Sequence, residues 1–362
     1  MTAAATFVIA EAGVNHNGSL ALAGELVDAA VEAGADAVKF QTFKADRLVE
    51  KSAPRAAYQQ RNTGSNASQY EMLKALELDA ESHRALREQC RRRGIEFMST
   101  AFDLESLAFL VGEIGIRRVK IPSGEAVNAP LLLAAMRTGL PVILSTGMCT
   151  GAEVMESLAV LAWGEEHPEG NPVSRAAFLE LTGRPEFCRP LQARVSLLQC
   201  VTQYPAPAAE TNLRAMQALG RQTGLQVGLS DHTEGWHVAV AAVAAGATII
   251  EKHFTMSRGL PGPDHAASLE PHELARMIRE IRDVEAAMGT GVKEPGAQEI
   301  ANRIPARGSL VAAVPIRKGD AYTASNLTIK RPGNGVSPMA YWDYVSGRRA
   351  GRDYGQDEQI DP

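Results

Sequence analysis

The sequence of 362 residues lacks the features that would assign it to a secreted, membrane or nucleic-acid-binding class. Its four cysteines are Cys90, Cys149, Cys188 and Cys200, and they include no close pair and no CxxC motif. This spacing favours reduced thiols over a disulfide framework or a cysteine-rich metal site.

Positive charge is not in excess either, because the formal net charge is −5. Nucleic acids and anionic membranes select basic surfaces, so we expect neither as a partner. The apolar N-terminal residues run directly into Glu11 and Asn15 without a basic leader. We therefore expect neither a signal peptide nor a membrane span, and we predict a cytoplasmic protein.

The chain does contain a short apolar run followed by a polar loop and a helix-like stretch, repeated eight times along residues 1–288. The first six expected strands begin near Thr6, Asp36, Ile95, Arg118, Pro141 and Val195, and the last two end near Leu229 and Ile250. Eight such units predict an α/β fold, a closed (β/α)8 TIM barrel. An open parallel sheet of eight strands is the alternative.

Several segments fall outside this repeat. Residues 42–69 form a long polar segment, which we expect to cover the active face because long loops in compact domains are usually functional. Residues 165–191, rich in Pro, Gly and charge, are predicted to be an insertion, and residues 289–305 a linker. Residues 306–362 are predicted to form a small β-rich domain that leans on the barrel or on a second subunit, since so small a core is marginal alone.

Two histidines occupy matching positions on the last two expected strands. His232 and His253 each follow a strand of one βαβ unit, and neighbouring parallel strands lie about 4.8 Å apart, so both imidazoles can reach one ion. Asp231 and Glu251 precede them and are expected to orient them. We therefore predict that the two histidines bind a divalent metal, against the alternative of two ordinary structural histidines.

The other strand ends also carry polar groups, and in a barrel all these ends open on one face. They are Glu11, Lys39, Gln41, Thr100, Lys120, Ser123, Glu125, Ser145, Thr202, Tyr204 and Ser230, with Asp264 in a later Pro-Gly turn. Two lysines beside several hydroxyls suit a phosphate dianion, and carboxylates can move protons. These residues predict a metal-assisted reaction between a phosphorylated small molecule and a carbonyl compound. A class I aldolase with Lys120 as its Schiff base is the competing interpretation.

Eight motifs follow one another along the chain and together carry a family resemblance. They are AEAGVNHNG (10–18), VKFQT (38–42), KIPSGE (120–125), LSTGM (144–148), GLSDHT (228–233), EKHF (251–254), PGPD (261–264) and KRPGNG (330–335). In combination they resemble the sialic acid synthases over essentially the whole chain. The resemblance implies a barrel joined to an antifreeze-like SAF domain. It also implies condensation of phosphoenolpyruvate with an N-acetylated aldose to a nine-carbon 2-keto acid, with release of phosphate.

The same resemblance implies a role for each matched position. Mn²⁺, with Mg²⁺ or Co²⁺ as alternatives, would be bound by His232 and His253. Phosphoenolpyruvate would contact Lys39, Lys120, Ser123, Ser145, Thr202 and Ser230. The sugar would contact Gln41, Thr100, Tyr204 and Arg331, and the catalytic groups would be Glu11, Glu125 and Asp264. A domain-swapped homodimer is implied, in which Arg331 of one subunit reaches the sugar's N-acetyl group in the other.

The expected acceptor is N-acetylmannosamine, which would give N-acetylneuraminate. The alternative is a 2,4-diacetamido-6-deoxy hexose, which would give legionaminic or pseudaminic acid. One position departs from the family pattern, because Val201 replaces a common threonine and removes a hydroxyl from the sixth strand end. A non-catalytic carbohydrate- or ice-binding protein is disfavoured, since it leaves the polar strand ends without a purpose.

Overall fold

The computed structural model describes residues 5–55, 68–170 and 174–362. These residues form two compact units, of which the first ends at Thr290 and the second begins at Gly291. None of the helices in the described ranges has both the length and the apolar character needed to cross a bilayer.

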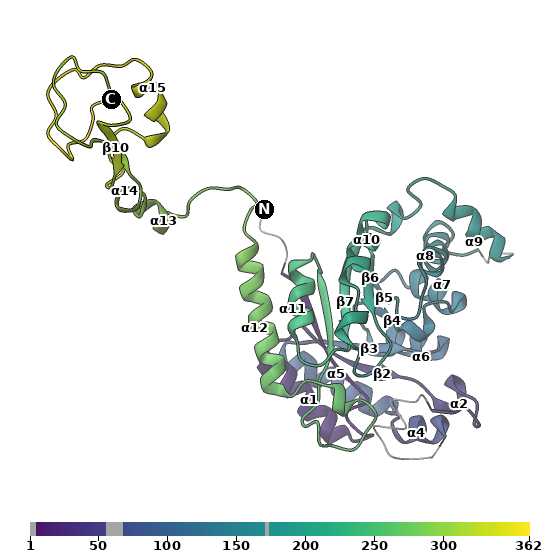
Figure 1. Ribbon diagram of the computed structural model, residues 1–362. Helices are drawn as coiled ribbons and strands as arrows, with labels where there is room; N and C mark the ends of the chain where they lie inside the picture. The colour runs from purple at the N-terminus through teal and green to yellow at the C-terminus, as the bar shows by residue number, and fades with distance from the viewer. Residues whose placement is uncertain (1–4, 56–67, 171–173) are drawn as a thin grey trace. The chain divides into compact units, whose positions relative to one another are not determined.

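Eight parallel strands form a closed barrel in the first unit, in chain order, and β8 pairs with β1 (Figure 1). They are β1 (Phe7–Gly13), β2 (Ala37–Thr42), β3 (Glu96–Ala101), β4 (Val119–Ile121), β5 (Val142–Ser145), β6 (Val195–Cys200), β7 (Gln226–Asp231) and β8 (Ile249–His253). The closed barrel confirms the predicted fold class and excludes the open sheet. His253 is the last residue of β8 and therefore lies within the strand. The sequence predicted it just beyond the strand end.

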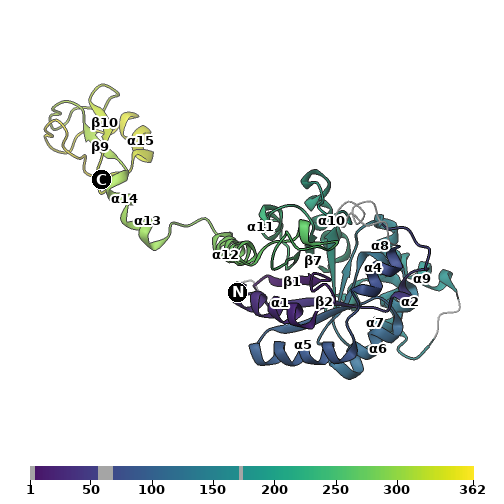
Figure 2. The same ribbon diagram turned by 90° about the horizontal axis from the view of Figure 1, so that it is seen from below.

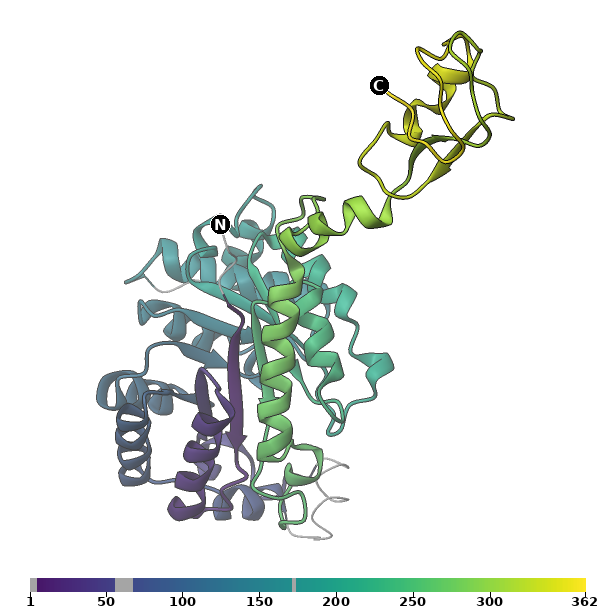
Figure 3. The ribbon, with the colours of Figure 1, turned by 90° about the vertical axis from the view of Figure 1, so that its left-hand side faces the viewer.

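Helices join the strands, and most of them pack around the outside of the barrel. They are α1 (Leu20–Ala33), α2 (Ala45–Leu48), α4 (Gln69–Ala75), α5 (Ala80–Arg93), α6 (Leu104–Phe109), α7 (Ala129–Arg137), α8 (Gly151–Glu166), α9 (Arg175–Thr182), α10 (Leu213–Thr223), α11 (His237–Ala244) and α12 (Pro271–Met288). Helices α1 and α5 lie side by side (Figure 2). Helix α12 packs against both α1 and α11, which closes the ring of helices where the chain of the barrel ends (Figure 3).

Two predicted segments outside the repeat contain helices. The long polar segment 42–69 includes α2, while residues 56–67 lie outside the described residues. The insertion at 165–191 includes α9 and a short 3₁₀ turn, η3 (Arg189–Leu191). Phe178 and Leu181 of α9 are buried in the main core, so this insertion packs against the barrel helices.

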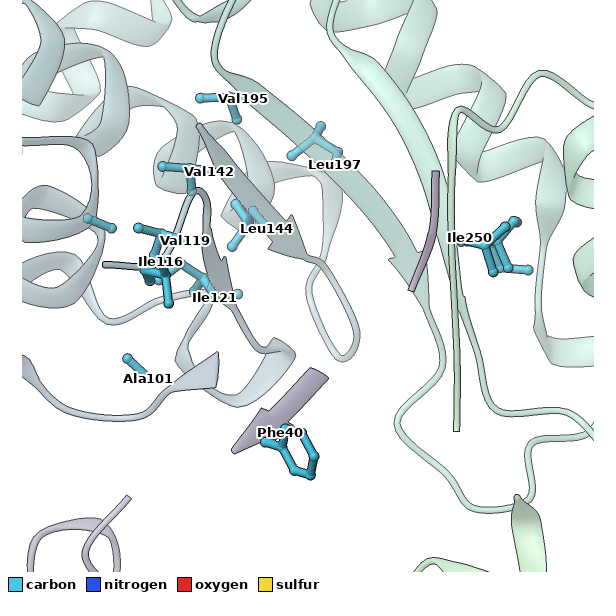
Figure 4. Close-up of a cluster of buried hydrophobic side chains, with 14 of the residues drawn as sticks. Phe40, Ala101, Ile116, Val119, Ile121, Val142, Leu144, Val195, Leu197 and Ile250 are labelled. Atoms are coloured by element: carbon cyan, nitrogen blue, oxygen red, sulfur yellow. The ribbon is translucent and has the colours of Figure 1, made fainter. Parts of the chain in front are cut away.

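Strand side chains alternate between the two faces of the sheet, and those that point outwards pack against the helices. Val142 and Leu144 of β5 and Val195 and Leu197 of β6 belong to this main core and are at most 1% exposed (Figure 4). Burial of such aliphatic side chains is the dominant stabilising contribution, at roughly 1.5–3 kcal/mol for each. The same alternation decides which residues face the inside of the barrel.

The inside of the barrel has an apolar layer, formed by Ile9, Ala37, Met98, Ile143, Leu198 and Ile249. Two positions further along the same six strands stand Glu11, Lys39, Thr100, Ser145, Cys200 and Glu251. Residues two apart on a strand share a face, so these side chains also point inwards. The strands therefore place polar and ionisable groups directly above this apolar layer, at the carboxyl end of the barrel.

The second unit holds strands β9 (Ser309–Ala312) and β10 (Leu327–Lys330), which pair antiparallel, and helices α13 (Ala297–Ala301), α14 (Arg303–Ala306) and α15 (Tyr341–Val345). Its own core includes Leu310, Ile316 and Leu327. This is the small β-rich domain that the sequence predicts. Residues 289–305, predicted to be a linker, contain α13 and the start of α14.

Candidate active site

A cavity of about 340 Å³ lies at the carboxyl ends of the barrel strands. Every predicted site residue of the barrel lines it, namely Glu11, Lys39, Gln41, Thr100, Lys120, Ser123, Glu125, Ser145, Thr202, Tyr204, Ser230, His232, His253 and Asp264. Arg331 is the one predicted site residue in the second unit, where it follows β10 and is exposed.

Four paired charges form the floor of the cavity. Lys39 Nζ lies 2.6 Å from Glu11 Oε2 and 3.6 Å from Glu251 Oε2. Lys120 Nζ lies 3.3 Å from Glu251 Oε1, so Glu251 bridges the two lysines. All four residues are at most 5% exposed. We call these four residues, Glu11, Lys39, Lys120 and Glu251, the charge layer.

Hydroxyl groups add hydrogen bonds to the charge layer. Lys39 donates to Thr100 Oγ1 and Lys120 donates to Ser145 Oγ, each at 2.8 Å. Ser230 Oγ donates to Glu251 Oε1 at 2.7 Å. Thr100, predicted to contact the sugar, thus lies beside the lysine that is predicted to hold phosphoenolpyruvate.

Burial and pairing shift the pKa values of the four groups of the charge layer in different directions. Burial raises the pKa of Glu11 to about 7, against the opposing effect of Lys39. Burial alone would raise the pKa of Glu251 as well, but Lys120 and Lys39 together hold it well below its usual range. Burial lowers the pKa of Lys120, whereas the two carboxylates more than offset burial at Lys39 and raise its pKa. Glu11 is therefore the carboxyl of this layer that can exchange a proton near neutral pH.

Glu251 lines the cavity and bridges the two lysines, although the sequence did not predict it as a site residue. The prediction that Asp231 and Glu251 orient the histidines is wrong, because their hydrogen bonds go to other groups. Asp231 and His232 are adjacent and point to opposite faces, so Asp231 cannot support His232. Glu251 shares a face with His253, but its hydrogen bond is to Ser230. The period-two spacing from Ile249 through Glu251 to His253 was the signal that could have placed Glu251 inside the barrel.

An oxyanion corner is formed by Ser123, Ser145, Gly147 and Thr202, at the ends of β4, β5 and β6. The backbone N–H of Gly147 donates to Ser123 Oγ at 3.0 Å. Thr202 Oγ1 is buried and has no hydrogen-bond partner among the described residues. A buried hydroxyl without a partner is costly unless a ligand satisfies it. This corner therefore suits an anion with several acceptor oxygens.

Gly147 permits the close approach of the groups in this corner. A Cβ atom at this position would collide with Thr202 Oγ1 and would lie 2.7 Å from Ser123 Oγ. No larger residue fits without displacing these hydroxyls.

His232 is oriented by a backbone group. Its Nδ1 lies 2.7 Å from the carbonyl oxygen of Val201, so Nδ1–H donates and Nε2 carries the lone pair. Burial alone would lower the pKa of His232, but Cys200, the Val201 carbonyl and Glu251 together raise it. The Tyr204 ring lies 4.1 Å from the His232 ring and 5.5 Å from the ring of His253, and packs against both.

His253 supplies a second imidazole, with 5.3 Å between the two ring centroids. Its Nδ1 is buried and has no hydrogen-bond partner within the described ranges. Burial, followed by the nearby His232, lowers the pKa of His253 well below its usual value, which favours the neutral form that binds metals. No group of three or more His, Cys, Asp or Glu side chains in the described part of the chain is arranged to hold a metal ion. The two histidines therefore fit an ion whose other ligands are oxygens of substrate or water.

A buried ion pair outside the barrel ties the two histidine-bearing segments together. Lys252 Nζ lies 2.9 Å from Asp231 Oδ2, and both side chains are 0% exposed. The same ammonium group donates to the carbonyl oxygen of Thr233, and Asp231 Oδ1 accepts from Thr233 N at 2.9 Å. The segments just before His232 and His253 are thus fixed to each other on the outer side of the barrel.

Three further predicted residues line the cavity with carboxyl or amide groups. Glu125 Oε2 accepts from Asn128 Nδ2 at 2.6 Å, and Gln41 Nε2 lies 3.4 Å from Glu11 Oε1. Burial raises the pKa of Asp264 to about 6. Each is a polar group that a hydroxylated ligand can use.

Comparison with known proteins places this site in a family. The NeuB family model matches residues 26–293 and the SAF domain model matches residues 307–362. The chain is 44% identical to the N,N'-diacetyllegionaminic acid synthase of Campylobacter jejuni over 98% of both chains. It is 45% identical to the synthase of the same name from Legionella pneumophila, over 94% of this chain and 90% of that one.

A solved structure, the N-acetylneuraminic acid (sialic acid) synthetase of Leptospira borgpetersenii, is 32% identical, with a TM-score of 0.66 and coverage of 82% and 90% of the two chains. The family model spans most of the barrel, and the relatives match both units. The chain therefore belongs to the NeuB family, the family of the sialic acid synthases, and carries a SAF domain.

Proposed function

We propose that this protein condenses phosphoenolpyruvate with a 2,4-diacetamido-6-deoxy hexose, giving N,N'-diacetyllegionaminic acid and phosphate. The observation that carries the proposal is the cavity in which a charge layer, an oxyanion corner and two histidines meet. This combination supports a reaction between an anionic phosphate ester and a carbonyl compound.

Phosphoenolpyruvate would use the lysines and hydroxyls of the cavity. Lys39 and Lys120 supply positive charge at the floor, and the hydroxyl of Thr202 supplies a donor that no described protein group satisfies. Because Glu11 and Glu251 already balance the two lysines, the site is selective for a ligand that also satisfies the hydroxyl groups.

His232 and His253 would hold the divalent ion, Mn²⁺ in the first instance. When bound, such an ion supplies Lewis-acid polarisation of the sugar aldehyde. The carbonyl of Val201 keeps the imidazole of His232 in one tautomer, and Tyr204 packs against both rings. These contacts fix the rings before any ligand arrives, which reduces the cost of ordering the site.

The reaction forms one carbon–carbon bond. Carbon 3 of phosphoenolpyruvate adds to the aldehyde carbon, water adds at carbon 2, and the tetrahedral intermediate expels phosphate. Glu125 and Asp264 are the carboxyl groups available to take the proton from the attacking water, and Glu11, whose pKa lies at about 7, is the one that can give a proton.

The sequence alone predicted N-acetylmannosamine as the acceptor. We now propose the alternative acceptor, a 2,4-diacetamido-6-deoxy hexose. The two legionaminic acid synthases are 44% and 45% identical to this chain, whereas the sialic acid synthetase is 32% identical. This difference favours a diacetamido acceptor.

The test is release of phosphate from phosphoenolpyruvate with N-acetylmannosamine and, separately, with each diacetamido hexose, with Mn²⁺ or excess EDTA. We expect release with a diacetamido hexose, loss of release with EDTA, and loss in His232→Ala. His237→Ala is the matched control, because His237 is exposed at the start of α11 and does not line the cavity.

If folded protein releases no phosphate with any of these sugars, the proposal is overturned. Trapping of a pyruvate adduct by borohydride, undiminished by EDTA, would instead support the aldolase interpretation with Lys120.

A further inference from the structure

One side of the cavity is apolar. Its lining includes a group of side chains that we call the apolar wall, formed by Val14, Leu48, Met72, Leu73, Leu76 and Phe102. All six belong to a small hydrophobic cluster separate from the main core. Leu48, Leu73 and Phe102 are only half-buried, so apolar surface remains open on this side of the cavity.

The apolar wall and the oxyanion corner lie on different sides of the barrel mouth. The wall comes from the segments that follow β1, β2 and β3, whereas the corner comes from the ends of β4, β5 and β6. In a closed barrel of eight strands, β2 and β6 are opposite each other. A ligand that places its anionic group in the corner therefore extends its far end towards the wall.

No cation belongs to the wall among the residues that the structure describes. The described residues that line the cavity include two cationic side chains, Lys39 and Lys120, and both are paired with carboxylates in the charge layer. A phosphate on the far end of a sugar would meet no partner among these residues. Gln69 of α4 also lines the cavity. A hydroxyl group packed against the six wall side chains themselves would lose water without gaining a hydrogen bond, since aliphatic and phenyl groups accept none.

We propose that the apolar wall is the surface that selects a 6-deoxy acceptor, by receiving the methyl group at carbon 6. This inference rests on the proposed function and adds the residues that choose the acceptor. Carbon 6 is the end of the hexose farthest from the reacting aldehyde, so it is the end that reaches across the mouth. The wall discriminates against a hydroxymethyl group and still more against a phosphorylated one.

The test compares two acceptors that differ at one atom, the 2,4-diacetamido-6-deoxy hexose and its 6-hydroxy counterpart. We expect the unmodified enzyme to prefer the 6-deoxy sugar in kcat/KM by roughly 10- to 100-fold, the discrimination typical of an apolar pocket. Met72→Gln keeps the length of the side chain and suits helix α4. It should reduce this preference at least about fivefold, mainly through KM for the sugar, with KM for phosphoenolpyruvate unchanged.

Leu73→Gln is the second variant, and it is the safer one for folding because Leu73 is half-buried. Leu104→Gln is the matched control, since Leu104 is 50% exposed on α6 and does not line the cavity. Equal use of both sugars by the unmodified enzyme, or variants that slow both sugars alike, would overturn the proposal. Absence of turnover with either sugar would instead mark failure of the proposed function, and this inference would fall with it.

Discussion

At the scale of single residues, the pair Lys252–Asp231 holds the backbone behind the two histidines. Lys252→Met removes the charge that Asp231 needs, and a buried carboxylate left unpaired costs about 3–5 kcal/mol. We expect this loss in the free energy of unfolding measured in urea. Lys74→Met is the control, because the Lys74 side chain is 48% exposed and pairs made by exposed lysines contribute about 1 kcal/mol or less. Equal losses in the two variants would contradict the assigned role.

The absence of a side chain at Gly147 leaves room for the hydroxyl groups of the oxyanion corner. In Gly147→Ala the new methyl group displaces the hydroxyls of Ser123 and Thr202, so we expect affinity for phosphoenolpyruvate to fall at least about tenfold. Calorimetric titration measures this loss. Gly151→Ala is the matched control, because a Cβ there meets nothing within 4 Å and Gly151 does not line the cavity. Unchanged affinity in Gly147→Ala would refute the oxyanion corner.

At the scale of elements, the loops after β1 and after β8 each contain a histidine that the fold keeps neutral. Burial lowers the pKa of both His16 and His265 to about 4. His265 Nδ1 lies 2.7 Å from Thr255 Oγ1, and its Nε2 lies 3.2 Å from Asn17 Oδ1, so one ring links two loops of the barrel mouth. His16 and Asn17 of the NHNG motif, together with His265, thus support the site and do not line its cavity.

This arrangement predicts a pH dependence of stability. Because the folded-state pKa values are lowered, the stabilisation is complete above the unfolded value of about 6.5 and is lost as pH falls towards 4. For His16 the loss amounts to about 3 kcal/mol. His265→Gln should flatten the decline in unfolding free energy between pH 7 and pH 5, whereas His272→Gln, at an exposed position, should not. Identical slopes in all three proteins would contradict this account.

The elements and most of the site could be predicted because strand ends in a barrel converge. A polar residue after an apolar run, as at Lys120 or Ser145, is placed by chain order alone once the barrel is assumed. The role of Glu251 in the charge layer was not predicted, because the sequence suggested a role beside the nearby His253. Its partners Lys39 and Lys120 come from strands that are distant in the sequence. Long-range pairing of this kind depends on barrel register, which the sequence of one chain does not display.

Val201 has a role that the sequence did not predict. The sequence shows only that its side chain lacks the hydroxyl of the family pattern, whereas in the structure its backbone carbonyl orients His232. Every amino acid carries that group, so the departure from the family pattern leaves this interaction intact.

At the scale of the whole molecule, the two units are proposed to work in trans within a homodimer. Arg331 of one subunit would serve the barrel of the other, so Arg331→Ala and His232→Ala should each have low activity alone. Mixed dimers of the two variants contain one intact barrel served by one intact SAF domain. We expect mixing with subunit exchange to restore up to about a quarter of the activity of the unmodified protein, the share of complete sites among random dimers.

Phosphate release after mixing and re-equilibration measures this recovery. A mixture of Arg331→Ala with Arg331→Ala/His232→Ala is the control, because no dimer in it contains a complete site. Absence of recovery from a mixture shown to exchange subunits would refute the swapped arrangement.

The balanced charge layer has a calorimetric consequence. Lys39 and Lys120 already face Glu11 and Glu251, so a trianionic ligand arrives in a layer with no surplus positive charge. Its field raises the pKa of Glu11 further above 7, and the carboxyl takes a proton from the buffer as the ligand binds. At pH 7.5 the heat of binding phosphoenolpyruvate should therefore differ between buffers of different ionisation enthalpy, and Glu11→Gln should abolish the difference. The ligand then enters together with a hydrogen ion, and its affinity declines in alkaline solution.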